Sequence, residues 1–323
     1  MIPPIRDKVK TSFASLPALE RLLHSLYNNT SNPCKSKEDR QMEKNYRAEL
    51  VGVFGDPVDG NPTGVMEEAG FAAKGLNYRY ITAKVLPEDL EAAFAGAKAM
   101  NMRGLNLTMP HKIKIIPLLD RLTQAAQIIG AVNTVINDNG TWVGENTDGK
   151  GFVLAMGLDG VALEGKRITL LGAGGAARAI AVECALAGAS HINVINRNEE
   201  RGRELAQLIE TATPASSAYL PWTTAVRIPE DTEVLIQATC VGLGSDEKPD
   251  IDYDTIQSHM AVSDVVFNPV MPAFLKEAQK RGAKVITGIG MLVQQGAKNF
   301  ELWTGESAPV DVMYQALEKE FAE

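Results

Sequence analysis

The chain has 323 residues, 32 Lys and Arg against 40 Asp and Glu, a formal net charge of −8 and 45% hydrophobic residues. This length predicts about two domains, and the apolar content is enough for packed cores, which excludes a mainly disordered chain. The acidic balance argues against nucleic acid as a partner, because basic surfaces bind that polyanion.

Cysteine and histidine are sparse and scattered. The three cysteines are Cys34, Cys184 and Cys240, and no C-x-x-C pair exists. We therefore expect no disulfide framework and no metal site, and a reducing, cytoplasmic compartment. No apolar run reaches the length of about 18 residues that a membrane span needs, and we find no signal peptide, so we expect no membrane role.

Residues 1–48 form a distinct N-terminal extension. They hold nine Lys and Arg against five Asp and Glu, whereas the remainder is acidic. Leucines at 19, 22, 23 and 26 have helical spacing and predict one short helix. The extension is interpreted as a surface segment that caps the body or is partly disordered, or alternatively as a helix that docks a partner.

From residue 50 onward, strand and helix patterns alternate in two series. In the first series we predict strands at 50–54, 78–83 and 104–108, helices at 65–73, 87–100 and 110–121, and a hairpin of 132–137 with 141–144. In the second we predict strands at 167–171, 191–195, 234–237, 265–267 and 284–286, and helices at 176–187, 199–209 and 272–281. Helices at 291–304 and 310–321 follow. The alternation predicts parallel sheets in two α/β domains.

A glycine-rich turn lies where the strand at 167–171 meets the next helix. Its sequence is Gly172-Ala173-Gly174-Gly175-Ala176-Ala177. This fits G-x-G-x-x-G/A, in which the first glycine makes the tight turn and the second lets backbone approach a pyrophosphate at the helix N-terminus. A strand before the turn and a helix after it support a dinucleotide-binding site over a purely structural glycine turn.

The end of the next strand bears on the choice between NAD and NADP. A site that prefers NAD usually has Asp or Glu there, to bind the ribose hydroxyls. This chain has Asn196 and Arg197, with Arg201 one helical turn later. Guanidinium groups pair bidentately with phosphate, so we expect NADP. NAD stays possible, because Glu199 and Glu200 are close by.

Polar residues gather in three segments of the first series. Asn106, Thr108 and Lys112 span the end of a strand and the start of a helix, while Asn133 and Asp148 follow further on. Each segment alone is an ordinary loop with a capping residue. Together the three segments predict a pocket that contains one lysine and one aspartate.

With these motifs, the sequence of residues 50–323 resembles those of the shikimate/quinate dehydrogenase family. The matching segments are Asn106-Leu107-Thr108-Met109-Pro110-His111-Lys112, Gly130-Ala131-Val132-Asn133-Thr134, Asn146-Thr147-Asp148-Gly149, the glycine-rich turn, Asn196-Arg197, and Gly288-Ile289-Gly290-Met291-Leu292-Val293-Gln294-Gln295. The resemblance implies a Rossmann-type NAD(P)-binding domain at 151–286, inserted in a substrate-binding catalytic domain. That domain spans 49–150 and is completed by C-terminal helices at 287–323.

The resemblance also implies roles for single residues. Lys112 and Asp148 would be the acid/base pair in reversible hydride transfer between a nicotinamide cofactor and the ring C3 of shikimate or a close analogue. Asn106, Asn133 and Gln295 would bind substrate hydroxyls, with Thr108 beside them. Thr239 and Gly288 would join the glycine-rich turn in contacting the cofactor.

The segment that binds the substrate carboxylate departs from the family pattern. The family carries His-Ser-x-Ser-Pro after its first strand, whereas this chain has Gly60, Asn61 and Thr63 at the His and Ser positions. Phe267 also replaces a frequent Tyr, Gln237 an Asn and Thr287 an Asp. We interpret this as retained chemistry with an altered or broadened substrate preference, since hydroxyl recognition discriminates strongly.

Three hypotheses follow for the function. The first is an NADP-dependent shikimate dehydrogenase-like enzyme acting on a hydroxylated ring carboxylate. The second is a quinate/shikimate dehydrogenase that uses NAD or either cofactor. The third, from another class, is a non-catalytic dinucleotide or metabolite sensor. We expect a monomer or a homodimer.

Overall fold

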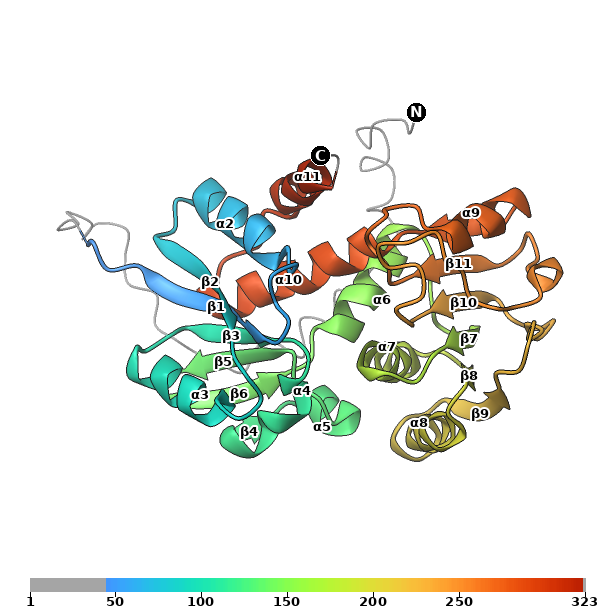
Figure 1. Cartoon of the computed structure of the whole chain (residues 1–323), viewed down its shortest axis with the longest axis horizontal. Helices are drawn as coiled ribbons and strands as arrows, with labels where there is room; N and C mark the ends of the chain where they lie inside the picture. Colours follow the sequence, from blue (N-terminus) through green and yellow to red (C-terminus); the bar gives the residue numbers. More distant parts are fainter. Residues whose placement is uncertain (1–44, 322–323) are drawn as a thin grey trace. The chain divides into compact units, whose positions relative to one another are not determined.

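The computed structural model describes residues 45–321 (Figure 1). The helix expected near residues 19–26, Cys34 and nearly all of the extension lie outside the described residues. Within residues 45–321 the strands form two six-stranded sheets with helices packed against them. The predicted α/β fold class is therefore confirmed.

The first sheet is mixed. Its strand order is β2-β1-β3-β5-β6-β4, in which β1 pairs in parallel with β2 and β3, while β5 is antiparallel to both β3 and β6. Its strands are β1 (Glu49–Gly55), β2 (Tyr78–Lys84), β3 (Gly104–Leu107), β4 (Arg121–Leu122), β5 (Thr134–Asp138) and β6 (Thr141–Glu145). Its helices are α2 (Thr63–Lys74), α3 (Leu90–Ala99), α4 (His111–Lys114), α5 (Gln124–Ile129) and the 3-10 turn η2 (Ile116–Leu118).

The single helix predicted over 110–121 is wrong. The chain makes only the short α4, then η2, and then the edge strand β4. Pro117 lies inside η2, and a proline lacks the N–H that a continuing α-helix needs. Helix α5 was not predicted; it begins at the N-cap Thr123, whose side chain accepts a hydrogen bond from the Ala126 N–H.

The second sheet pairs its strands in parallel throughout, in the order β12-β11-β10-β7-β8-β9. Its strands are β7 (Arg167–Leu171), β8 (His191–Asn196), β9 (Ser216–Pro221), β10 (Val234–Gln237), β11 (Ala261–Asp264) and β12 (Lys284–Ile286). The helices around it are α7 (Gly175–Leu186), α8 (Glu199–Ala212), α9 (Ala273–Lys280) and the 3-10 turn η3 (Tyr253–Thr255). Strand β9 was not predicted, and the strand expected at 265–267 is wrong, because β11 ends before it.

Two helices connect the sheets. Helix α6 (Asp148–Leu158) leads from β6 toward β7, and α10 (Gly288–Thr304) follows β12 and lies beside α6 (Figure 1). A Cβ atom on Gly151 would lie 2.6 Å from the Gln295 backbone nitrogen, so glycine is what lets these helices approach. Trp303, near the end of α10, donates to the Val135 carbonyl at 3.1 Å. The chain thus returns from the second sheet to the first.

The last helix, α11 (Val310–Glu320), packs against α2 beside the first sheet. Buried Met313 and Leu317 join it to a core shared by β1, α2 and α10. No helix in the described part of the chain is long and apolar enough to cross a membrane.

Candidate active site

Lys112 and Asp148 are brought together from segments 36 residues apart. Lys112 lies on α4, which follows β3, and Asp148 is the first residue of α6, which follows β6. The Lys112 Nζ donates to Asp148 Oδ2 at 2.6 Å. The two side chains keep 26% and 14% of their surface exposed, so a ligand can reach the ion pair.

Asn133 fixes the orientation of the aspartate. Its amide nitrogen Nδ2 donates to Asp148 Oδ1 at 2.7 Å, while its Oδ1 accepts from the Thr147 backbone N–H at 2.7 Å. Each carboxylate oxygen of Asp148 therefore has its own donor, one on Lys112 and one on Asn133. Because Asn133 is buried, the carboxylate is held by a rigid partner.

The predicted substrate residues Asn61, Thr63 and Asn106 lie in one polar cluster around Tyr80. The Tyr80 hydroxyl donates to Asn106 Oδ1 at 2.8 Å and also contacts the Thr63 side chain. The Thr63 N–H donates to Asn61 Oδ1 at 3.0 Å. Asn106 donates in turn to the Asn133 carbonyl at 3.2 Å, which links this cluster to the Lys112–Asp148 pair.

Thr108 lies between β1 and α4. Its N–H donates to the Phe54 carbonyl at 3.0 Å, and its own carbonyl accepts from the His111 N–H at 2.8 Å. A Cβ atom on Gly55 would lie 2.2 Å from Thr108 Cγ2, so the end of β1 packs tightly against this threonine.

Gln295 is linked to the aspartate through two further residues. It lies on α10, where its Oε1 accepts from Asn299 Nδ2 at 3.1 Å. Asn299 Oδ1 accepts in turn from the Thr147 hydroxyl at 2.8 Å, and Thr147 directly precedes Asp148. Helix α10 thus contributes to the same polar network as the first sheet.

The glycine-rich turn joins β7 to α7 as predicted. Gly172 has φ +113°, a conformation that favours glycine, and its N–H donates to the Ile195 carbonyl at 2.8 Å. Gly174 is the N-cap of α7, and Cβ atoms built on Gly174 or Gly175 meet nothing within 4 Å. The α7 N-terminus therefore faces open space with its backbone N–H groups, which fits a pyrophosphate.

Thr239 and Gly288 lie near the same edge of the sheet. A Cβ atom on Gly172 would lie 3.0 Å from Thr239 Cγ2, and one on Gly288 would lie 2.7 Å from the Val265 carbonyl. Asp264, between them, is buried, and burial raises the pKa of its carboxyl to about 7. These residues line the carboxyl ends of the strands, where open α/β sheets bind ligands.

Asn196, Arg197 and Arg201 lie at the carboxyl end of β8 and the start of α8. The Asn196 side chain donates to the Asn198 carbonyl at 2.8 Å, and Asn198 caps α8 by accepting from the Arg201 N–H at 2.9 Å. Within residues 45–321, neither guanidinium has a carboxylate partner. Two unpaired cations beside a helix N-terminus fit a phosphate group.

Comparison with known proteins gives the family. The model of the shikimate dehydrogenase substrate binding domain matches residues 53–135, that of shikimate / quinate 5-dehydrogenase matches 155–242, and that of the shikimate 5'-dehydrogenase C-terminal domain matches 288–318. Shikimate dehydrogenase (NADP(+)) of Desulforamulus reducens is 41% identical over 283 residues, which cover 86% of this chain and 97% of the relative. The chain belongs to the shikimate dehydrogenase family. It is thus an oxidoreductase that acts on a CH–OH group.

Solved structures of two relatives agree in fold. The ligand-free 5-ketofructose reductase of a Gluconobacter species has a TM-score of 0.83 and 41% identity, covering 86% of this chain and 100% of its own. Shikimate 5-dehydrogenase of Listeria monocytogenes, in complex with shikimate and NAD, has a TM-score of 0.78 and 33% identity, covering 84% and 96%.

Sequence reasoning missed Tyr80 and Asn299, which belong to the site network, and Glu67, which lies beside Tyr80. Asn299 could have been found, because it lies four residues after Gln295 on one face of a helix. Glu67 is fully buried beside Tyr80, and neither of its oxygens has a partner among the described residues. Burial raises the pKa of the Glu67 carboxyl well above its usual range, and it raises the pKa of Tyr80 as well.

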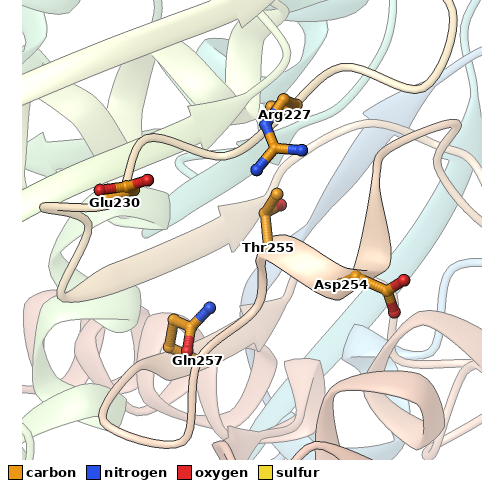
Figure 2. A pocket seen from close by; sticks show the side chains of 5 residues that line it. All are labelled: Arg227, Glu230, Asp254, Thr255 and Gln257. Atoms are coloured by element: carbon orange, nitrogen blue, oxygen red, sulfur yellow. The ribbon is translucent and has the colours of Figure 1, made fainter.

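A polar hollow lies elsewhere in the second sheet's half of the chain (Figure 2). Arg227 and Glu230 precede β10, and Asp254, Thr255 and Gln257 precede β11. These loops enter the sheet at the amino ends of its strands, whereas the glycine-rich turn leaves it at a carboxyl end. The hollow is therefore separate from the candidate cofactor site.

Proposed function

We propose that this chain is an NADP-dependent dehydrogenase that reversibly reduces a ring ketone, 3-dehydroshikimate or a close analogue, to the alcohol. The observation that carries the proposal is the Lys112–Asp148 ion pair, with its 2.6 Å contact and its orientation by Asn133. The relatives named shikimate dehydrogenase (NADP(+)) support the same reaction.

Lys112 is the proposed proton donor. A bound, reduced nicotinamide supplies hydride to the carbonyl carbon, which leaves negative charge on the carbonyl oxygen. The Lys112 ammonium stabilises that charge and gives its proton to the oxygen, so the alcohol forms and the lysine becomes a neutral amine. Asp148 accepts a hydrogen bond from the ammonium and orients it; in alcohol oxidation the neutral amine takes the proton back.

The cofactor proposal rests on the glycine-rich turn and the two arginines. Open space at Gly174 and Gly175 lets the phosphates approach the α7 N-terminus, where Ala173 and Ala176 complete the turn. Arg197 and Arg201 fit a 2′-phosphate, which NADP carries and NAD lacks. NADP is therefore the proposed cofactor, with NAD as the weaker alternative.

The proposed substrate contacts are the polar side chains around Tyr80 and α10. Asn106 and Asn133 offer amide groups, which both donate to and accept from ring hydroxyls. Asn61 and Thr63 would form the end of the pocket that meets the substrate carboxylate. Thr108 and Gln295 lie beside the polar network. These assignments extend to this chain what the resemblance implies for the family.

A second candidate substrate is a polyhydroxylated ketone without a carboxylate. The relative named 5-ketofructose reductase is 41% identical to this chain, and its named substrate is a keto sugar. The Asn61 side-chain carbonyl is already engaged by the Thr63 N–H, and residues 60–63 contain no cation to attract a carboxylate. Quinate is a further alternative, because one matching family model is named for both acids.

The test follows the absorbance of reduced nicotinamide with shikimate, quinate and 5-ketofructose. Each is assayed in the appropriate direction with NADP(H) and with NAD(H). Turnover of shikimate with NADP is expected. Turnover of 5-ketofructose alone would replace the substrate proposal, and binding of NADP without any turnover would favour the sensor hypothesis.

A further inference from the structure

Arg197 and Trp222 are neighbours because of the sheet register. Strand β8 pairs in parallel with β9, with Asn196 opposite Pro221, and each of these is followed by one of the two residues. The Trp222 backbone N–H donates to the Asn196 carbonyl at 3.2 Å, which continues the pairing one step beyond the strands. Both side chains therefore begin at the carboxyl edge of the sheet, where the cofactor is proposed to bind.

The two side chains are in direct contact. The Arg197 guanidinium carbon lies 5.3 Å from the centre of the Trp222 ring, within the range of a cation–π interaction. The indole N–H donates to the Asp250 carbonyl at 3.0 Å, so the edge of the ring is held in place. Trp222 is thus a partly buried ring, held by a hydrogen bond, over which the guanidinium lies.

The environment of Arg197 differs from that of a nearby arginine in a similar contact. Arg203, on α8, lies 5.1 Å from the Tyr219 ring, but it also forms an ion pair with Glu199 at 2.8 Å. Arg197 has no carboxylate partner within the described residues. A guanidinium held over an aromatic ring, with no carboxylate partner among these residues, still has N–H groups to offer an anion.

We propose that Trp222 is a positioning residue that sets the preference for NADP over NAD. It restricts the Arg197 side chain so that the guanidinium edge is already available to the 2′-phosphate before the cofactor binds. This rests on the proposed NADP function and deepens it. An unsupported arginine would lose conformational freedom on binding, and the affinity for the phosphate would fall.

The test measures binding rather than turnover. Calorimetry with adenosine 2′,5′-bisphosphate and with AMP compares two probes that differ by the 2′-phosphate, using the full chain. Trp222→Leu should weaken the bisphosphate about three- to fivefold, the scale of an exposed cation–π contact, and leave AMP unchanged. Trp222→Phe, which keeps an aromatic face, should restore most of the affinity.

A double-mutant cycle isolates the contact. Arg197→Ala should weaken the bisphosphate by about tenfold or more, the scale of a charge-assisted hydrogen bond, and Trp222→Leu should then have no further effect. Arg203→Ala is the matched control: it removes an equally charged, aromatic-stacked arginine from the same region. It should change the preference for the bisphosphate less than Trp222→Leu does.

Any one of four outcomes would overturn the inference. Equal weakening of both probes by Trp222→Leu would mean that the indole contacts adenine rather than acting through Arg197. An unchanged affinity of Trp222→Leu for the bisphosphate would mean that Trp222 has no role in binding it. An additive effect of Trp222→Leu in the Arg197→Ala background would mean that the two residues act independently. If the unaltered chain itself bound both probes equally, the proposed NADP function would fail as well, which distinguishes the two failures.

Discussion

Glu183 makes a sharp prediction about stability and pH. It lies on α7 where this helix meets α6, and a Cβ atom on Gly149 would lie 2.7 Å from its Cγ. Its Oε1 is buried with no hydrogen-bond partner among the described residues. Burial, reinforced by the charge of Glu145 and opposed by Lys150, raises the pKa of Glu183 to about 7.

The magnitude follows from linkage between protonation and folding. The carboxyl pKa rises from its ordinary value of 4.5 to about 7 in the folded chain. At about 1.4 kcal/mol per pKa unit, the shift corresponds to about 3 kcal/mol. The folded state binds the proton more tightly, so this stability is fully present below the unfolded pKa and is lost as pH rises through about 7.

Glu183→Gln removes this titration. The variant should therefore gain up to about 3 kcal/mol in free energy of unfolding, relative to the unaltered chain, between about pH 4 and about pH 8. Urea unfolding followed by circular dichroism at a series of pH values measures the difference. The contributions of other buried carboxyls, such as Asp264, to the pH dependence cancel in this difference, because both proteins carry them.

The control is Glu204→Gln, which alters an exposed side chain on α8. It should leave the pH dependence of the unfolding free energy unchanged. If Glu183→Gln differed from the unaltered chain by the same amount at every pH, burial would not be what holds the proton on Glu183, and the reasoning would be refuted.

The remaining predictions concern the site and its packing. Lys112→Ala should lower kcat by about 10²-fold or more, the scale of one acid–base group, with NADP affinity retained; a kcat near that of the unaltered enzyme would exclude the assigned role. Gly149→Ala would put a Cβ atom 2.3 Å from the Ala179 carbonyl, so thermal unfolding should begin at lower temperature. Gly157→Ala, on the same helix with nothing within 4 Å, should raise stability instead. Glu67→Met should raise Tm at neutral pH, because it removes a buried, unpaired carboxyl; a lower Tm would show that the carboxyl has a stabilising partner.

The dinucleotide turn was predictable because its chemistry is local. A tight turn with positive φ at Gly172 and a close helix start at Gly174 need particular residue types within a few positions. The flanking strands and α7 follow from the same pattern, and the predicted bounds differ from those of the structure by only a residue or so. Nothing distant in the sequence is needed to specify this unit.

Strand β11 was misplaced for the opposite reason. The apolar run at 265–267 has the composition of a buried strand, whereas the actual strand ends in the polar Ser263 and Asp264. Pairing with β10, in which Gln237 lies opposite Asp264, determines which residues join the sheet. Such pairing joins parts of the chain that are distant in sequence, so it cannot be predicted from local composition.

Helix α6 was not among the predicted elements, and its glycines give little local support for a helix. Gly149 and Gly151 each lower helix propensity by about 1 kcal/mol relative to alanine. In the structure, however, each glycine is where a neighbouring helix approaches: α7 at Gly149 and α10 at Gly151. Tertiary packing overrides the local preference, and the helix exists because of what surrounds it.

The same distinction applies to the active site. The residues predicted a pocket with one lysine and one aspartate, and the family resemblance implied proton transfer between them and a substrate. Lys112 at the start of α4 and Asp148 at the start of α6 have no reason, locally, to meet. Their contact depends on Asn133, which reaches Asp148 from the segment before β5, and on the antiparallel pairing of β5 with β6. That pairing carries the chain from Asn133 back to Asp148. The types of residue at the site can therefore be recognised from the sequence. The 2.6 Å contact between Lys112 Nζ and Asp148 Oδ2, in contrast, depends on how the sheet pairs its strands.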